Sequence, residues 1–167
     1  LWYEDPYRDG SVSATSHARL REKLDTPILV SEHVRGLEQK ANFLLQGSCD
    51  MIHADPEYDM GITGAMKIAH FCEALGFDIQ MHACGPAHRA VIAAIRNTHF
   101  YEMALIGPDM PNAVPPIYLN GYSDQPEDLE EDGCVPVPDG PGLGVVYDWE
   151  FITRLSLIHI SEPTRPR

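Results

Sequence analysis

Short apolar runs alternate with longer amphipathic segments through residues 1–103, and this alternation limits the possible folds more than any other feature of the sequence. The apolar runs predict strands, and the amphipathic segments between them predict helices. Strands are expected at 1–4, 26–31, 50–54, 77–81 and 99–103, and helices at 11–24, 35–46, 62–75 and 86–96. Repeated strand–helix units indicate an α/β fold with a parallel sheet.

The helix expected at 62–75 carries the clearest signals. Its apolar residues recur at intervals of three and four, and Gly76 follows at the position where glycine ends many helices. Pro86 starts the next predicted helix, where its missing N–H is not needed. After Gly107 the sequence becomes rich in proline and glycine, which predicts loops, and the acidic run at 127–132 is expected to be a solvated surface.

The composition argues against several classes of function. The chain of 167 residues carries 12 Lys and Arg against 25 Asp and Glu, which gives a formal net charge of −13. Such acidity argues against nucleic-acid binding through phosphate contacts, and it is compatible with a hard cation such as Mg²⁺. No apolar run reaches the roughly 18 residues that a membrane span needs. The four cysteines form no CxxC motif, which predicts reduced thiols in a cytoplasmic protein.

An ionisable residue stands at the end of each predicted strand. These residues are Glu4, Glu32, Asp55, His82 and Glu102, and the gaps between them are 28, 23, 27 and 20 residues, about one strand–helix unit each. In a parallel barrel the carboxyl ends of the strands meet at one site, so we expect these side chains to converge. Converging carboxylates provide oxygen ligands for Mg²⁺, and an acid beside a histidine raises the histidine pKa for acid–base work. The alternative for any single residue is a helix cap or a solvated loop position.

Several motifs, in their order and spacing, resemble a known family. They are WYEDP (2–6), SEH (31–33), HADPEYDMGITG (53–64), QMHACGP (80–86) and FYEMA (100–104). Together they are similar to the later barrel strands of the enolase superfamily, in its mandelate racemase/muconate lactonizing enzyme subgroup. PDGPGLGVVYD (138–148) resembles the C-terminus of that subgroup, so the resemblance runs from about residue 1 to about residue 152. It implies strands four to eight of an incomplete, TIM-like (β/α) barrel.

The resemblance implies a role for each residue that matches a motif of the family. Glu4 and Glu32 match metal-binding carboxylates, which implies Mg²⁺ as the cofactor. Asp55 and His82 match a dyad in which the histidine transfers a proton and the aspartate supports it. Glu102 matches the acid that hydrogen-bonds the substrate carboxylate or enolate.

Three further residues are candidate substrate contacts. His33 follows Glu32 directly, and His53 precedes Asp55 by two residues, so that the two side chains point the same way along a strand. Tyr58 stands where mandelate racemase has a lysine, three residues after the aspartate of the dyad, and this chain departs from that racemase there. The alternative for the two histidines is a structural or loop position.

The function that the resemblance implies is Mg²⁺-dependent dehydration of a small-molecule sugar acid to a 2-keto-3-deoxy acid, through an enediolate. Racemisation or epimerisation of a 2-hydroxy acid would use the same residues. A non-catalytic barrel relic that acts as a binding or scaffold subunit is an alternative from another class. The resemblance also implies a homo-oligomer for the full-length protein, whereas the acidity and the lack of a long apolar run predict neither a nucleic acid nor a membrane as partner.

The domain organisation is expected in three parts. Residues 1–106 form the later strand–helix units of the barrel, and residues 107–154 form a C-terminal segment that packs back toward a capping domain. Residues 155–167 (LSLIHISEPTRPR) differ in character from what precedes them and are expected to be a non-native tail, with a genuine polar tail as the alternative. We expect the chain to be a fragment whose third metal carboxylate and lysine base lie upstream, and therefore to be inactive by itself.

Overall fold

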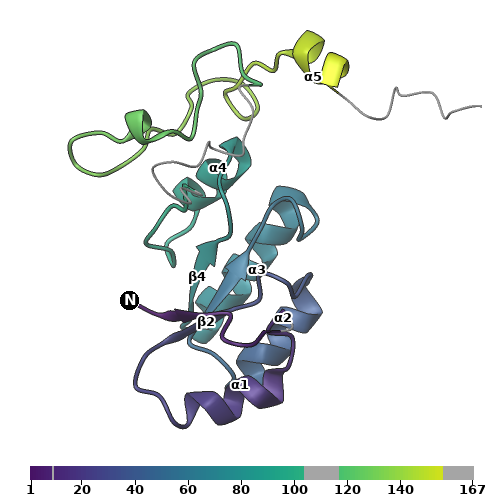
Figure 1. The fold of residues 1–167 in the computed structure, drawn as a ribbon, viewed down its shortest axis with the longest axis vertical. Coiled ribbons are helices and arrows are strands. Elements are labelled where there is room, and N and C mark those ends of the chain that lie inside the picture. Colours follow the sequence, from purple (N-terminus) through teal and green to yellow (C-terminus); the bar gives the residue numbers. More distant parts are fainter. Residues whose placement is uncertain (9, 104–116, 156–167) are drawn as a thin grey trace, which may run out of the picture. The chain divides into compact units, whose positions relative to one another are not determined.

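The computed structural model describes residues 1–8, 10–103 and 117–155 (Figure 1). The chain divides into two compact units, Leu1–Ala104 and Leu105–Arg167. The first unit holds a four-stranded sheet whose strands follow one another in chain order, with every neighbouring pair parallel. Its strands are β1 (Tyr3–Glu4), β2 (Ile28–Val30), β3 (Met51–Ala54) and β4 (Asp78–Met81).

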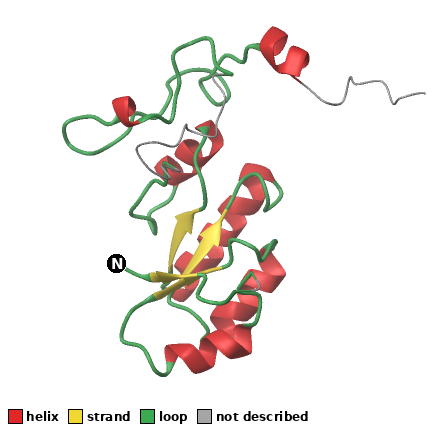
Figure 2. Cartoon of the chain, viewed as in Figure 1, coloured by secondary structure: helices red, strands yellow, loops and turns green. Residues whose placement is uncertain are grey.

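Helices connect the parallel strands, as the alternating pattern predicts. They are α1 (Ala14–Arg21), α2 (Leu37–Leu45), α3 (Gly61–Leu75) and α4 (Pro86–Ala94), and the first three lie along one side of the sheet (Figure 2). α1 begins after Ser13, whose hydroxyl accepts a hydrogen bond from the Ser16 N–H. α3 ends at Gly76, which has the left-handed φ of 77° that glycine adopts without strain. All four predicted helices are therefore confirmed, with ends a few residues shorter in α1, α2 and α4.

The hydrophobic core lies between the sheet and the helices. Alternate residues of β2, β3 and β4 point into it, and they pack against apolar side chains of α2, α3 and α4. The strand residues of this core are Ile28, Val30, Ile52, Ala54, Ile79 and Met81. The intervening residues His53 and Gln80 are also buried, although they are polar. The face of the sheet turned away from the helices therefore carries buried polar side chains.

The strand predicted at 99–103 is not present, because the structure describes these residues as irregular. The Ile79 N–H donates to the carbonyl of Asn97, which brings the segment beside β4. Further along, the Ala83 N–H donates to the side chain of Glu102 and not to a backbone carbonyl. The segment therefore follows β4 through one backbone hydrogen bond and a side-chain contact, without the repeated backbone bonds of a strand.

The described part of the second unit is mostly irregular, as its proline and glycine content predicts. It contains the 3₁₀ turn η1 (Pro126–Asp128), an isolated bridge between Tyr118 and Tyr147, and the short helix α5 (Trp149–Leu155). The loop prediction missed α5, a seven-residue helix whose start is capped by Asp148, which accepts the Phe151 N–H. The predicted tail lies outside the described residues except for Leu155, the last residue of α5.

The helices of the described ranges are all too short or too polar to cross a bilayer. None of the four cysteines, which all lie in the described ranges, is in a disulfide, and three of them are buried.

Candidate active site

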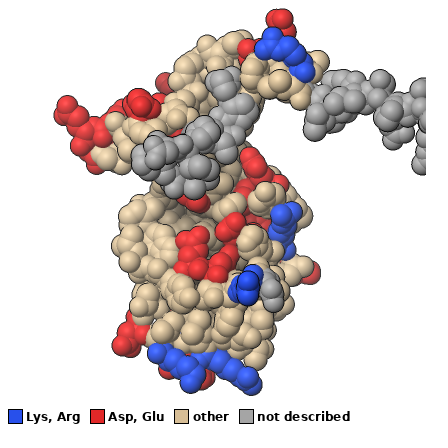
Figure 3. All heavy atoms as spheres, in the orientation of Figure 1, with Lys and Arg blue, Asp and Glu red and all other residues tan. Residues whose placement is uncertain are grey.

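The predicted site residues follow the carboxyl ends of the strands. Glu4 is the last residue of β1, and Glu32 follows β2 by two residues. Asp55 and His82 come directly after β3 and β4. Because the strands are parallel, their carboxyl ends share one edge of the sheet, and side chains distant in sequence meet there. Acidic atoms gather on the face of the first unit shown in Figure 3, and Lys and Arg atoms lie beside this group as well as at α1.

Asp55 and His82 form the predicted pair. His82 Nδ1 lies 2.7 Å from Asp55 Oδ2, and since a carboxylate only accepts, Nδ1 carries the proton of this hydrogen bond. The other oxygen of Asp55 accepts the Glu57 N–H at 2.6 Å and lies 3.3 Å from Nε2 of the buried His88. Burial acts to raise the pKa of Asp55, but the hydrogen bonds from His82 and the Glu57 N–H, together with the neighbouring His88, outweigh it and hold this pKa well below its usual range.

His82 is a suitable group for proton transfer at this position. The hydrogen bond to Asp55 raises the pKa of His82, burial opposes this, and the charges of Glu32 and Glu102 raise the pKa further. Its second ring nitrogen, Nε2, lies 3.2 Å from Glu32 Oε1. One ring nitrogen is thus anchored to Asp55, and the other faces the acidic groups of the site. This orientation allows Nε2 to exchange a proton with a bound molecule.

His53 lies beside the dyad as a neutral imidazole. It is 2% exposed, and its Nε2 is 3.7 Å from Glu4 Oε1. Burial lowers the pKa of His53 to about 3, and the charges of His82 and Lys40 act in the same direction. Its ring centroid is 5.8 Å from that of His82. The prediction that His53 points the same way as Asp55 agrees with this position, and at neutral pH the ring offers one donor and one acceptor.

The other predicted contacts surround His82 less closely. The Tyr58 ring stacks over His82 with centroids 6.1 Å apart, and the guanidinium carbon of Arg35 lies 3.9 Å from the Tyr58 centroid. His33 is exposed, with its Nε2 3.8 Å from Glu32 Oε1. Glu102 accepts the Ala83 N–H through Oε2 at 2.6 Å, which places its carboxylate near His82 although no strand carries it.

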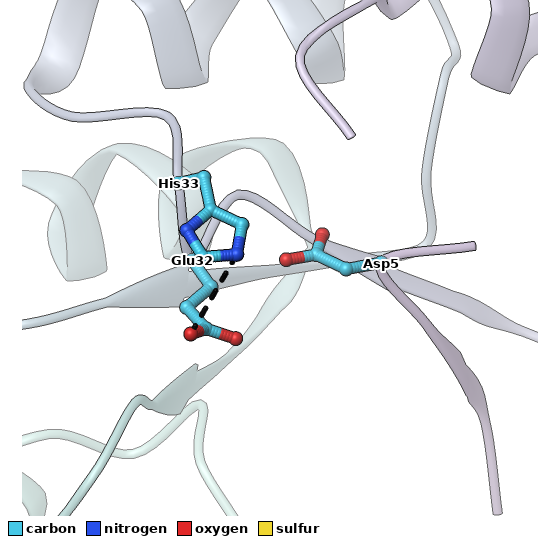
Figure 4. A group of neighbouring side chains, drawn as sticks. All are labelled: Asp5, Glu32 and His33. Carbon is cyan, nitrogen blue, oxygen red and sulfur yellow. Dashed lines mark ion pairs between the residues drawn. The ribbon is translucent and has the colours of Figure 1, made fainter. Parts of the chain in front are cut away.

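Asp5, which was not among the predicted site residues, follows β1 directly and lies beside two residues that were. One ligand atom each of Asp5, Glu32 and His33 lie within 4.8 Å of one another, and Figure 4 shows these side chains with the ion pair between His33 and Glu32. Asp5 Oδ1 accepts the Ser31 N–H, whereas Oδ2 is buried and has no hydrogen-bond partner among the described residues. Burial raises the pKa of Asp5. The adjacent acids in the WYEDP motif were the signal that could have indicated it.

The carboxylates of this edge fit a hard cation. Mg²⁺ prefers oxygen ligands and is bound by one or two carboxylates. Within the described ranges no lysine or arginine pairs with Glu4, Glu32 or Asp5, whose charged neighbours are other acids and histidines. Glu4 accepts the Trp2 Nε1–H at 2.9 Å and lies near His53, outside the group that contains Asp5. These acids have no lysine or arginine partner in the described ranges, and Asp5 Oδ2 has no hydrogen-bond partner there, so a divalent cation would find oxygen ligands at this edge.

The dyad predicts a pH dependence of stability in the metal-free chain. The raised pKa of His82 gives a stabilisation that is present below the unfolded value of about 6.5 and is lost as the pH rises through the folded value. The lowered pKa of Asp55 gives a stabilisation that is present above about 3.9 and is lost as the pH falls through the folded value. We therefore expect the free energy of unfolding in urea with EDTA to fall more between pH 6 and 9 in the wild type than in Asp55→Asn.

Asp78→Asn is the control for this pH series. Asp78 pairs with His99 at 3.1 Å, and both side chains are exposed at the opposite end of β4, so its loss should leave the wild-type pH slope in place. His53 is unchanged in both variants, so its effect on the slope cancels in the comparison. Equal slopes for the wild type and Asp55→Asn would contradict the prediction.

Comparison with known proteins identifies related families. A model described as enolase C-terminal domain-like matches residues 1–151. The N-succinylamino acid racemase of Thermus thermophilus is 27% identical over 143 residues, which cover 84% of this chain and 37% of the racemase. The D-gluconate/D-galactonate dehydratase of Picrophilus torridus is 27% identical over 133 residues, which cover 79% of this chain and 33% of the dehydratase. The chain therefore spans well under half the length of these curated relatives.

A solved structure gives the same fold. The D-glucarate dehydratase from Agrobacterium tumefaciens, crystallised in complex with magnesium, is 32% identical and superposes with a TM-score of 0.79. The match covers 92% of this chain and 39% of the dehydratase. The predicted fold class is confirmed, because the parallel α/β arrangement matches the C-terminal part of a TIM barrel.

Proposed function

Because the enolase C-terminal domain-like model matches residues 1–151, this chain belongs to that family, and we propose that its site serves Mg²⁺-dependent dehydration of a sugar acid to a 2-keto-3-deoxy acid. The observation that carries the proposal is the pair of Asp55 and His82 at 2.7 Å, with the carboxylate of Glu32 at the second ring nitrogen. The likeness to D-glucarate dehydratase supports the sugar acid as substrate class. The proposal concerns the whole protein of which these residues form a part.

Glu4 and Glu32 are the residues that we propose as metal ligands, with Asp5 close enough to Glu32 to support the site. When bound, Mg²⁺ would stabilise negative charge on the substrate carboxylate and make the neighbouring C–H more acidic. One or two carboxylates are the usual protein ligands of Mg²⁺.

His82 supplies the proton for the leaving group. A base takes the proton next to the carboxylate of the sugar acid, and the electrons of that C–H bond form the enediolate. Their return expels the hydroxyl group on the next carbon, and this hydroxyl takes the proton of Nε2 to leave as water. Asp55 keeps the imidazole in the tautomer with Nδ1 protonated and raises its pKa, so that Nε2 also carries a proton before the transfer. The resulting enol tautomerises to the 2-keto product.

The remaining predicted residues contact the substrate in this proposal. Glu102, whose carboxyl group lies near His82, is the residue that hydrogen-bonds the enediolate in this proposal. His53 stays neutral and donates to a substrate oxygen from beneath the dyad. Tyr58 and His33 lie at the exposed side of the site, where they contact the hydroxyl groups of the sugar chain.

Racemisation or epimerisation of a 2-hydroxy acid is the second candidate, because a curated racemase is among the relatives. In both reactions the proton next to the carboxylate is removed first, and they differ in the step that follows. In dehydration the hydroxyl group leaves, whereas in racemisation a proton returns to the other face. The products therefore separate them: a 2-keto acid reacts with semicarbazide, and an epimer does not.

The test is a screen of sugar acids with Mg²⁺ against the protein encoded by the whole reading frame that contains these residues. We expect a semicarbazide-reactive product from at least one acid, and its loss in His82→Asn. Optical rotation that changes without a keto product would favour the racemase. Absence of both reactions would favour a non-catalytic relic. The expected inactivity of the 167-residue chain alone, and the cytoplasmic location and homo-oligomeric state of the full protein, remain predictions.

Metal binding is predicted to depend on Glu32. Replacing this carboxylate by an amide in Glu32→Gln removes one negative charge from the site, and we expect Mg²⁺ affinity to fall by about tenfold or more. Isothermal titration of the 167-residue chain measures this without any substrate. Glu38→Gln is the matched control, since Glu38 is exposed on α2 and contributes the same charge to the whole chain. Equal affinities for the two variants would contradict Glu32 as a ligand.

A further inference from the structure

A buried ion pair lies behind the dyad and takes no part in the proposed reaction. Lys40 of α2 and Asp59 of the loop between β3 and α3 are 2% and 0% exposed. Lys40 Nζ lies 2.6 Å from Asp59 Oδ2. Charged side chains are rarely buried unless several hydrogen bonds satisfy them, so the partners of this pair indicate what it does.

The other partners of the pair are backbone groups beside the site. Lys40 Nζ also donates to the carbonyl of His53 at 2.7 Å, and Asp59 Oδ2 also accepts the N–H of Asp55 at 2.9 Å. The second oxygen of Asp59 accepts the Gly36 N–H at 2.7 Å. The pair therefore holds the chain just before and just after Ala54, and it ties this stretch to the start of α2.

These backbone groups need such partners because the regular pairing with β2 ends before them. The last register pair of β2 and β3 is Val30 with Ile52. Ser31, the residue after β2, has a φ of 87°, outside the extended conformation of a strand, and its hydroxyl lies 3.3 Å from the carbonyl oxygen of His53. Buried backbone groups without partners are costly, so Lys40 and Asp59 replace the missing strand.

We propose that Lys40 and Asp59 are positioning residues, which fix the backbone of residues 53–55 so that the side chains of His53 and Asp55 face His82. Both side chains are attached to the residues that the pair holds, and a displacement of this stretch would move the carboxylate that orients His82. The proposal rests on the proposed function only in that it treats this site as the catalytic one.

The test uses the 167-residue chain without metal or substrate. The main variant is Lys40→Met combined with Asp59→Asn, which removes the donor to His53 and leaves no isolated charge. Two NMR readouts report on position: amide hydrogen exchange at Asp55, and the ¹⁵N shifts of the imidazole of His82. We expect exchange at Asp55 to become about tenfold faster or more, since a charge-assisted hydrogen bond is lost, and the Nδ1 signal of His82 to shift.

Asp50→Asn is the matched control. Asp50 likewise joins a cation, Arg21 at 2.7 Å, to a backbone N–H, that of Ile28, but it does so at the other end of the sheet. This variant should lower stability and leave the signals of His82 and Asp55 unchanged. If the double variant also left them unchanged and lowered only the urea midpoint, the pair would be merely structural and the proposal wrong.

Two further measurements keep the test decisive. If the double variant does not fold, Lys40→Gln combined with Asp59→Asn replaces it, because this pair keeps a donor and an acceptor at the two positions. We expect its His82 Nδ1 signal to stay close to that of the wild type. In the wild type, the amide of Asp55 must exchange at least about tenfold more slowly than exposed amides, or the proposal fails. A failed sugar-acid screen would overturn the proposed function and leave these readouts intact, whereas unchanged spectra would overturn the positioning role alone.

Discussion

Asp55→Asn is expected to lower kcat for dehydration by about 10²–10⁴-fold, the usual contribution of a positioned acid–base group, while KM changes little. The carboxylate of Asp55 accepts the Nδ1–H of His82 and raises the pKa of that imidazole. An asparagine at this position keeps the shape but loses the negative charge. Its amide N–H can also donate to Nδ1, which would favour the neutral tautomer with the proton on Nε2. Without the carboxylate the pKa of the ring falls, so the protonated imidazole becomes harder to form. The loss falls on the transition state more than on substrate binding.

The measurement is steady-state kinetics of the protein encoded by the whole reading frame, with the sugar acid identified by the screen. Asp78→Asn serves as the control, because Asp78 also pairs with a histidine, His99, but at the exposed opposite end of β4. It should retain wild-type kcat. A kcat for Asp55→Asn within a factor of about three of the control would contradict the role of the dyad, since general acid–base catalysis contributes far more than that.

The fold was predictable from the sequence because the two periodicities are clear and local. The runs that become β2, β3 and β4 are buried on both faces, so they appear as short apolar stretches between turn residues. Gly76 and Pro86 marked helix ends that depend only on backbone conformation. The segment at 99–103 was expected to be the last strand of the alternating pattern, but a strand also needs a backbone partner, which no local pattern reveals.

The convergence of the site was predictable for a different reason. Parallel strands bring their carboxyl ends to one edge, so a polar residue after each strand was enough to place Glu32, Asp55 and His82 together. The sequence could not rank the two acids of the WYEDP motif. The structure groups Asp5 with Glu32, whereas Glu4 lies near His53, and these contacts join segments that are remote in sequence.

The residues that hold the site residues in place were not predictable from one sequence. His88 lies within the helix predicted at 86–96, and no pattern in the sequence indicates that it lies 3.3 Å from Asp55. Lys40 carries a charge within an amphipathic helix, where most lysines face solvent, and nothing in the spacing to Asp59 indicates an ion pair. Such pairs join segments that are remote in sequence, and they depend on how the helices pack.

Lys40→Met is expected to lower the free energy of unfolding of the 167-residue chain by about 3–5 kcal/mol, the cost of leaving a buried charge without its partner. The variant removes the donor to His53 and leaves the carboxylate of Asp59 buried with only N–H donors around it. Since a domain is commonly stable by only about 5–15 kcal/mol, this loss would be a large part of the total. Urea unfolding followed by circular dichroism measures it.

Adding Asp59→Asn to Lys40→Met should recover part of this loss, because the neutral amide no longer carries an unpaired charge in the core. Arg21→Met is the control: its partner Asp50 is partly exposed, the ion pair is solvated, and its removal should cost roughly 1 kcal/mol or less. If Lys40→Met cost no more than Arg21→Met, water would have to reach Asp59 in the folded chain. The difference in stability loss between Lys40→Met and Arg21→Met therefore measures how far water is excluded from the Lys40–Asp59 pair. Exclusion of water strengthens the hydrogen bonds by which Lys40 and Asp59 hold residues 53–55 in one position.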